Sequence, residues 1–125
     1  MILIDTSVWV GHLRQGDDRL AELLLAGEVA CHAFVIGELA CGRIRNRDEV
    51  LALLSALPTL AKADDPEVLD FIERHHLAGT GLGLIDIHLL ASCMTDGAAL
   101  WTQDKKLAAT ATRLGCAAGP GTTNR

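Results

Sequence analysis

Short apolar runs and amphipathic stretches alternate along the chain. Apolar, β-compatible runs lie at residues 1–4, 28–31, 59–63, 98–102 and 116–118. The stretches between them place apolar side chains three and four positions apart, the spacing of a helix with one buried face. These helices are expected at residues 7–14, 19–26, 33–44, 48–57, 66–77, 84–95 and 104–114. Such alternation predicts an α/β fold, a three-layer α/β/α sandwich with a parallel sheet.

Two carboxylates follow directly on predicted strands. Asp5 ends the apolar run 1–4, and Asp104 comes just after the run 98–102. Open α/β sheets bind ligands at the carboxyl ends of their strands, so both side chains are expected at the edge where chemistry takes place. The alternative for Asp5 is that it ends the strand and caps the following helix.

Two further carboxylates lie within predicted helices. Glu38 is expected on a packed helix face, because its neighbours three and four positions away are apolar or small; they are Phe34, Val35, Cys41 and Gly42. Asp86 shares a face with Leu89 and Leu90. A carboxylate on a packed face is costly unless something compensates it. The alternatives are that Glu38 is rotated to the rim of its apolar face and that Asp86 only complements the helix dipole.

Together these four carboxylates predict a metal site. Helices that follow parallel strands begin at the carboxyl edge of the sheet, so Asp5, Asp86 and Asp104 should meet there, and Glu38 reaches it if its helix leans over. Four carboxylates repel one another strongly in one pocket. A hard divalent cation such as Mg²⁺, which takes oxygen ligands and serves phosphate chemistry, removes that cost. We therefore expect metal-dependent phosphoryl transfer with one or two ions.

Composition limits the partners and the location. The formal net charge is −5, whereas a nucleic-acid binder is expected to be basic, so RNA binding requires a local basic patch. The four cysteines have no C-x-x-C spacing and are expected to be buried free thiols in a reducing cytoplasm. No apolar stretch approaches the roughly 20 residues that span a bilayer, and no basic region of a signal peptide precedes the first strand. One domain is expected over residues 1–118, with a flexible tail at 119–125.

Four motifs, in order, resemble the PIN-domain ribonucleases, and in length and motif order the chain is similar to the VapC toxins of bacterial type II toxin–antitoxin pairs. The motifs are Asp5-Thr6-Ser7 after an apolar strand, Gly37-Glu38-Leu39, Asp86-x-x-Leu89-Leu90-Ala91-Ser92, and Trp101-Thr102-x-Asp104-Lys105. The resemblance covers about residues 1–118. It implies a sheet of strand order 3-2-1-4-5 with the acidic residues beside the first and fourth strands.

The resemblance also implies an activity and a set of partners. Asp5, Glu38, Asp86 and Asp104 would be the acidic catalytic and metal-binding residues, supported by the hydroxyls of Thr6 and Thr102. The metal would be Mg²⁺ or Mn²⁺ and the substrate structured RNA such as tRNA or rRNA. A VapB antitoxin would inhibit the protein, which would form a homodimer or a heterotetramer or octamer with it.

Three basic side chains are candidates for holding the phosphates that flank a cleaved bond. Lys105 and Lys106 lie in the first turn of a predicted helix, where the dipole disfavours cations, and Arg43 follows the helix of Glu38. The alternative for all three is plain solvent exposure. Two other functions stay open: a PIN-like module that binds RNA or protein without cleaving, and a metal-dependent phosphatase. The aspartyl-phosphate type of phosphatase requires Asp-x-Asp after the first strand, where this chain has Ser7.

Overall fold

Three short parallel strands form the centre of the computed structural model, which describes residues 1–119. β1 (Ile2–Ile4) lies between β2 (Val29–Ala30) and β3 (Ala99–Trp101), with Leu3 opposite Ala30 on one side and opposite Leu100 on the other. β1 is an apolar run buried on both faces, as expected of a central parallel strand. The rest of the predicted tail, residues 120–125, lies outside the described residues.

Single bridges continue the sheet at both edges. Thr59 pairs with Cys31 beyond β2, and Ala117 pairs with Leu100 beyond β3, both in parallel. The five segments follow the predicted order 3-2-1-4-5. The predicted strands at 59–63 and 116–118 are wrong, because each segment forms only a single bridge. The reason is clearest at Ala61, whose backbone N–H and C=O bond to the side chains of Asp96 and Ser92 instead of to a neighbouring strand.

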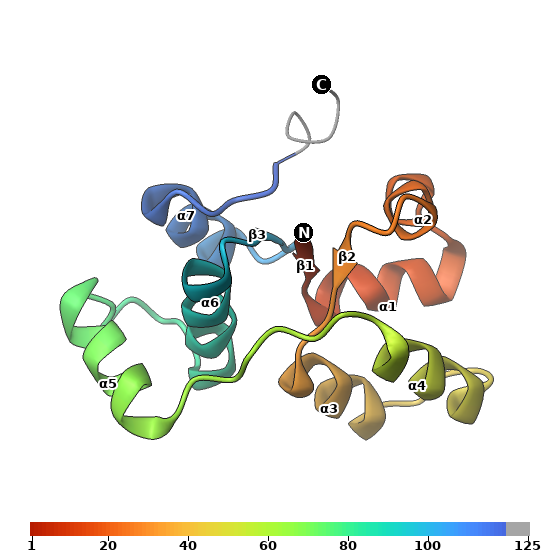
Figure 1. The fold of residues 1–125 in the computed structure, drawn as a ribbon, viewed down its shortest axis with the longest axis horizontal. Helices are drawn as coiled ribbons and strands as arrows, with labels where there is room; N and C mark the ends of the chain where they lie inside the picture. The colour runs from red at the N-terminus through yellow and green to blue at the C-terminus, as the bar shows by residue number, and fades with distance from the viewer. Residues whose placement is uncertain (120–125) are drawn as a thin grey trace.

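Helices pack on both sides of this sheet. They are α1 (Thr6–Gln15), α2 (Asp18–Leu25), α3 (Ala33–Cys41), α4 (Arg47–Ala56), α5 (Asp65–Arg74), α6 (Leu84–Asp96) and α7 (Lys105–Leu114). Figure 1 shows α5, α6 and α7 grouped on one side of the strands and α1 to α4 on the other, with the segment between α4 and α5 crossing from one group to the other. This is the predicted three-layer α/β arrangement, with strands much shorter than helices.

Side-chain caps explain why the helix starts agree with the sequence. Asp17 accepts a hydrogen bond from the backbone N–H of Leu20 at the start of α2. Asp64 and Glu67 form a reciprocal capping box at the start of α5. The prediction for α3 was too long, because the helix ends at Cys41 with Gly42 as its extended C-cap.

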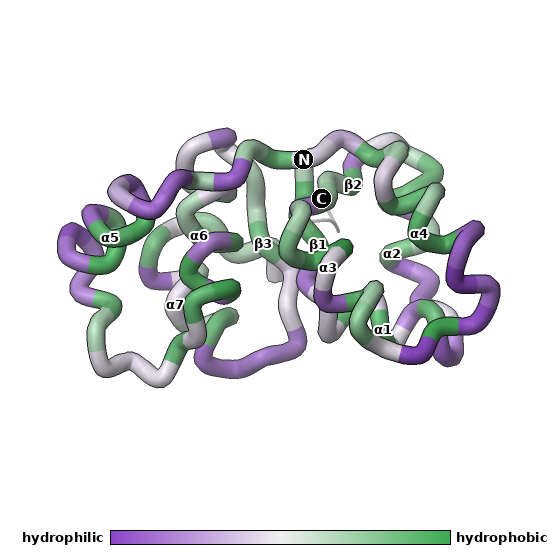
Figure 2. Tube along the Cα trace, turned by 90° about the horizontal axis from the view of Figure 1, so that it is seen from below, coloured by the Kyte–Doolittle hydropathy of each residue, from purple (hydrophilic) through white to green (hydrophobic). Residues whose placement is uncertain are grey.

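The core is one cluster of buried side chains that includes β1 and α6. Leu3, Ile4, Leu89 and Leu90 are fully buried, and every residue of α6 from Ile87 to Cys93 is buried. Apolar segments accordingly line the inside of the two helix groups, and hydrophilic segments lie at the outer ends of the molecule (Figure 2).

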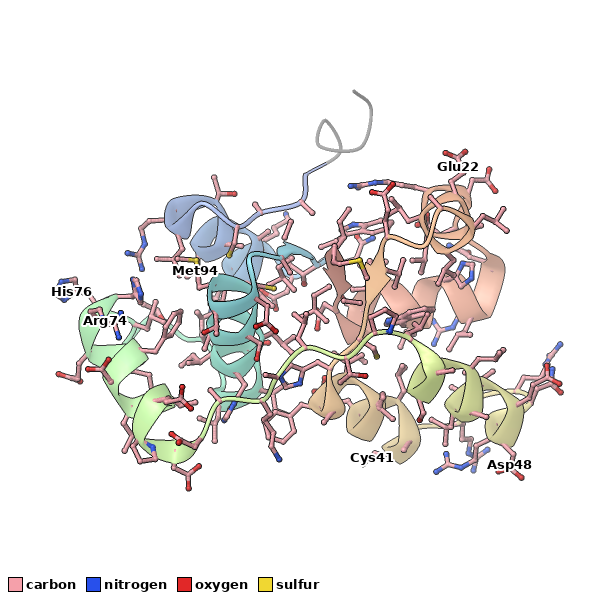
Figure 3. All side chains as sticks on the ribbon, viewed as in Figure 1. Glu22, Cys41, Asp48, Arg74, His76 and Met94 are labelled. Atoms are coloured by element: carbon pink, nitrogen blue, oxygen red, sulfur yellow. The ribbon has the colours of Figure 1, made fainter. Side chains whose placement is uncertain are left out.

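The cysteines are free thiols among the described residues, but one of them departs from the prediction. Cys31, Cys93 and Cys116 are buried, and burial raises the pKa of all three thiols. Cys41 is exposed at the carboxyl end of α3 (Figure 3), because this last turn projects beyond the core. Within residues 1–119, no helix has both the length and the apolar character required to cross a membrane.

Candidate active site

Asp5 is a buried carboxylate held by two hydroxyls at the carboxyl end of β1. Only 7% of the residue is exposed, and its backbone N–H donates to the carbonyl of Trp101 at 2.9 Å, so β1 and β3 end side by side. The Oδ2 atom accepts hydrogen bonds from Thr102 Oγ1 at 2.6 Å and from Ser7 Oγ at 3.0 Å. Both bonds go to the same oxygen, and within the described residues Oδ1 accepts no hydrogen bond from another side chain.

The two hydroxyls are themselves fixed by the backbone of the next loop. The N–H of Gln103 donates to Ser7 Oγ at 3.0 Å, and the N–H of Asp104 donates to Thr102 Oγ1 at 3.0 Å. Thr102, which was predicted as a supporting hydroxyl, thus contacts Asp5 directly. Ser7 was missing from the predicted site residues, although its place two residues after the strand-end carboxylate is the signal that could have found it.

Glu38 is exposed and lies at the rim of α3, so the expectation that it lies on a packed face is wrong. The buried residues of α3 are Val35 and Leu39, and one residue is a step of about 100° around a helix, so Glu38 points away from Leu39 toward α1. There its Oε1 atom accepts a hydrogen bond of 2.6 Å from Thr6 Oγ1. The alternative interpretation of Glu38 as a rim carboxylate holds, and it lies beside the predicted hydroxyl.

Asp86 is the half-buried carboxylate of the set. Its Oδ2 atom accepts a hydrogen bond of 3.3 Å from the backbone N–H of Gly83 at the start of α6. Burial raises the pKa of Asp86, the Gly83 N–H opposes that rise, and the negative charges of the other three predicted carboxylates add to it; these are Asp5, Asp104 and Glu38. The fold thus brings Asp86 within electrostatic range of the other three.

Asp104 is exposed and caps α7. Its Oδ1 atom accepts a hydrogen bond of 2.9 Å from the backbone N–H of Leu107. The Oδ1 atom thus caps the helix, and the Oδ2 atom takes no part in this hydrogen bond. The residue therefore serves the helix start, as Asp17 does for α2, while its charge acts on Asp86.

The donor set fits a hydrated Mg²⁺ better than an ion fully enclosed by protein. Within the described part of the chain, no three His, Cys, Asp or Glu side chains converge closely enough to hold an ion together. Mg²⁺ takes one or two carboxylates and keeps several of its waters, so it does not require such a cage. Burial first, and then the negative charges of the other carboxylates, raise the pKa of Asp86, and a bound cation would offset those charges.

The basic candidates occupy two different places. Arg43 lines a hollow of about 320 Å³ that also includes Thr6 and Glu38, together with Arg14 and Arg45. Lys106 lies against Gly81 in the loop before α6. The two are so close that a Cβ on Gly81 would be 2.9 Å from the Nζ atom of Lys106. Lys105 is exposed in the first turn of α7. Arg43 therefore lies beside a catalytic candidate, and Lys106 beside the loop that leads to Asp86.

Comparison with known proteins assigns the chain to a family. The PIN domain family model matches residues 2–113. Ribonuclease VapC32 from two strains of Mycobacterium tuberculosis is 49% identical over 118 residues, which cover 94% of this chain and 95% of the relative. The crystal structure of PAE2754 from Pyrobaculum aerophilum shares the fold with a TM-score of 0.63 at 19% identity, over 87% of this chain and 83% of that one. The resemblance found in the sequence is confirmed: the chain belongs to the PIN-domain family and groups with its VapC ribonucleases.

Proposed function

We propose that this protein is a Mg²⁺-dependent endoribonuclease, the toxin of a VapBC-type toxin–antitoxin pair, and that it cleaves structured RNA such as tRNA or rRNA. The observation that supports this most is the Asp5 carboxylate, buried and held by Thr102 and Ser7 at the strand end. A buried, oriented carboxylate whose charge acts on Asp86 is expensive for folding alone, but it suits binding of a divalent cation. Similarity to a ribonuclease over almost the whole chain supports the choice of RNA as substrate.

Each site residue has a role that follows from its contacts. The chemistry that a bound Mg²⁺ or Mn²⁺ would supply here is a water of lowered pKa for attack on a phosphodiester. Asp5 and Asp86 would be the direct ligands, and Glu38 and Asp104 would act directly or through water. Thr6 keeps Glu38 on the α1 side of the site through its 2.6 Å hydrogen bond. These hydroxyl contacts fix carboxylate rotamers in advance, which lowers the ordering cost of binding.

The hollow beside Glu38 offers a place for RNA phosphates. The salt bridge of the described residues joins Arg74 to Asp70 on α5, so Arg14, Arg43 and Arg45 are free to attract an external anion. They surround the hollow that contains Thr6 and Glu38, and Arg47 extends the basic surface next to it. This local patch is what an acidic chain requires to bind RNA. Lys105 and Lys106 would hold phosphates on the α7 side.

RNA cleavage with a matched control tests the proposal. Labelled structured RNA is incubated with the wild type, Asp5→Asn and Asp48→Asn in Mg²⁺, in Mn²⁺ and in EDTA; Asp48 is an exposed carboxylate on α4 outside the site. We expect cleavage by the wild type and by Asp48→Asn only when metal is present. Binding without cleavage would favour the non-cleaving module, and turnover of a generic phosphomonoester would favour the phosphatase.

RNA binding by charge variants tests the basic hollow. Each phosphate contact that is lost should lower the slope of log K against log salt by about 0.7 to 0.9. We expect Arg43→Gln and Arg45→Gln, each made in an Asp5→Asn background, to weaken RNA binding and reduce this slope. Arg74→Gln, which removes an exposed arginine on α5, is the control and should change neither quantity. Equal affinity and slope in all variants would remove the hollow from the RNA path.

The antitoxin would act on the same carboxylates. An Arg guanidinium pairs bidentately with carboxylates, so a basic antitoxin segment suits Asp5, Asp86 and Asp104 and would compete with the metal. Titration calorimetry of a VapB-type antitoxin across a Mg²⁺ series should show affinity falling as Mg²⁺ rises, and a weaker complex for Asp5→Asn. Affinity independent of both would mean that the antitoxin inhibits by covering the RNA path. The assembly would be cytoplasmic, with the toxin as a homodimer or in a heterotetramer or octamer.

A further inference from the structure

A fully buried histidine joins three segments of the chain behind the active site. His32 is 0% exposed and is the N-cap of α3, where its Nδ1 atom accepts a hydrogen bond of 3.0 Å from the backbone N–H of Phe34. Its Nε2 atom lies 3.0 Å from Ser92 Oγ on α6. Ser92 in turn donates to the carbonyl of Ala61 at 2.7 Å. We call this set, His32, Ser92 and Ala61, the His32 bridge.

The contacts of the His32 bridge define one protonation state. Ser92 has a single hydroxyl hydrogen, which it donates to Ala61, so its oxygen must accept from His32 Nε2–H. Nδ1 must then carry a lone pair, because it accepts from Phe34 N–H. The imidazole is therefore neutral, with its hydrogen on Nε2 and both nitrogens satisfied. A proton on Nδ1 would break the cap of α3.

The surroundings of the imidazole keep it neutral. Burial lowers the pKa of His32 to about 4, and the nearby His88 on α6 and Lys62 in the α4–α5 segment act in the same direction. The other neighbours are Phe34, whose ring lies 5.5 Å from that of His32, and the buried thiol of Cys31, which precedes it. Both charged groups that act on the pKa of His32, His88 and Lys62, thus oppose its charged form.

We propose that His32 is a positioning residue for cleavage: its bridge to Ser92 sets α3 against α6 and thereby sets Glu38 relative to Asp86. This inference rests on the proposed function. Glu38 and Asp86 each lie six residues from the bridge, Glu38 along α3 from His32 and Asp86 along α6 from Ser92. At 1.5 Å per residue, that is about 9 Å along each helix. A small change in helix orientation at the bridge is therefore a displacement of ångström scale at the carboxylates.

A second contact joins α3 and α6 near the His32 bridge. The ring of Phe34 packs edge-on against the ring of His88, with centroids 4.7 Å apart and an interplanar angle of 85°. Phe34 belongs to α3 and donates to His32, whereas His88 belongs to α6 and lies two residues from Asp86. The bridge and this aromatic pair lie on the same α3–α6 boundary, and loss of the bridge removes the hydrogen bond between the two helices.

Three variants separate positioning from simple capping. His32→Asn keeps a good N-cap, since Asn accepts the Phe34 N–H, but it is too short to reach Ser92. Ser92→Ala removes the bridge from the α6 side and leaves the cap intact. Asp64→Ala removes the cap of α5, a helix that carries none of the four carboxylates, and is the control for lost stability. The double variant His32→Asn with Ser92→Ala tests whether both residues act through one contact.

Steady-state cleavage of labelled RNA in saturating Mg²⁺, at a temperature where every variant is folded, gives the first result. We expect kcat to fall about tenfold for His32→Asn and for Ser92→Ala with KM unchanged, since an ångström-scale misplacement costs up to about a hundredfold. The double variant should lose no more than either single one, and Asp64→Ala should keep the wild-type kcat. Wild-type kcat in His32→Asn, or an equal loss in Asp64→Ala, overturns the proposal.

A measurement without substrate or metal keeps the test independent of the proposed function. Amide residual dipolar couplings report the angle between α3 and α6 in the metal-free protein. We expect this angle to change in His32→Asn and in Ser92→Ala, and to stay at the wild-type value in Asp64→Ala. If the wild type does not cleave RNA, the proposed function fails, and these couplings alone decide the bridge; unchanged couplings refute it.

Discussion

Acidification should destabilise the fold through His32, by an amount that can be worked out from the bridge. An unfolded chain binds a proton at His32 near the ordinary pKa of 6.5, whereas the folded chain resists protonation until about pH 4. The unfolded state therefore binds more protons in this window, and stability is lost as the pH falls from about 6.5 to about 4. At about 1.4 kcal/mol per pH unit, the loss is roughly 3 kcal/mol.

Chemical denaturation at a series of pH values measures this loss. The free energy of unfolding of the wild type and of His32→Asn is determined in urea from pH 7 to pH 4. We expect the wild type to be the more stable at pH 7 and its advantage to shrink by roughly 3 kcal/mol at pH 4. The raised pKa of Asp86 acts in the opposite sense, favouring the folded state as the pH falls, but it is common to both proteins and cancels in the difference.

An exposed histidine provides the control for this experiment. His76 is exposed at the end of α5 with a left-handed backbone (φ 55°), a conformation that Asn adopts readily (Figure 3). His76→Asn should therefore follow the wild-type pH profile closely. Parallel profiles for the wild type and His32→Asn would mean that the buried imidazole is not held neutral, and the hydrogen-bond assignment of the bridge would be refuted.

The remaining predictions concern the carboxylates and the thiols. Asp5→Asn and Asp86→Asn should each abolish RNA cleavage and growth arrest while the thermal unfolding midpoint stays unchanged or rises, because less negative charge remains in the metal-free site; near wild-type cleavage by either variant refutes the role of that residue. Glu38→Gln keeps an oxygen that can accept the hydrogen bond from Thr6. A fall in cleavage rate without a change in the thermal unfolding midpoint would therefore identify Glu38 as a functional carboxylate. Full activity would identify it as structural. Ellman's reagent should label Cys41 within the folded protein and the other three thiols only after denaturation, and labelling of a second thiol in the native state would contradict their burial.

Much of the fold follows from local signals in the sequence. The predicted starts of α2 and α5 agree with the structure, where Asp17 and Asp64 are the N-caps, and β1 was predicted because a four-residue apolar run ends in a carboxylate. The outer strands were harder to predict, because a segment pairs as a strand only if its backbone N–H and C=O groups bond to a neighbouring strand. At Ala61, two side chains of α6 bond to these backbone groups instead. No pattern within residues 59–63 predicts these two hydrogen bonds.

The same division applies to the site. The charges of Asp5, Glu38 and Asp104 act on Asp86, but the side of α3 on which Glu38 lies depends on where Leu39 meets the core. Ser7 and His32 were missed, because their importance lies in contacts with residues far along the chain. The signals in the sequence were a hydroxyl two residues after Asp5 and a histidine at the first position before an apolar helix.

The contact between Thr102 and Asp5 has a consequence for the synthesis of the protein. These residues are 97 positions apart, and β1 pairs with β3 over a similar separation. Loops of this length close slowly compared with local helices, so the site is among the last parts of the fold to form. On a ribosome, the first strand emerges long before its partner has been translated. A nascent or prematurely terminated chain that lacks Thr102 has only Ser7 to hold the Asp5 carboxylate, so a cell would be exposed to the complete site only after β3 and Thr102 have been made.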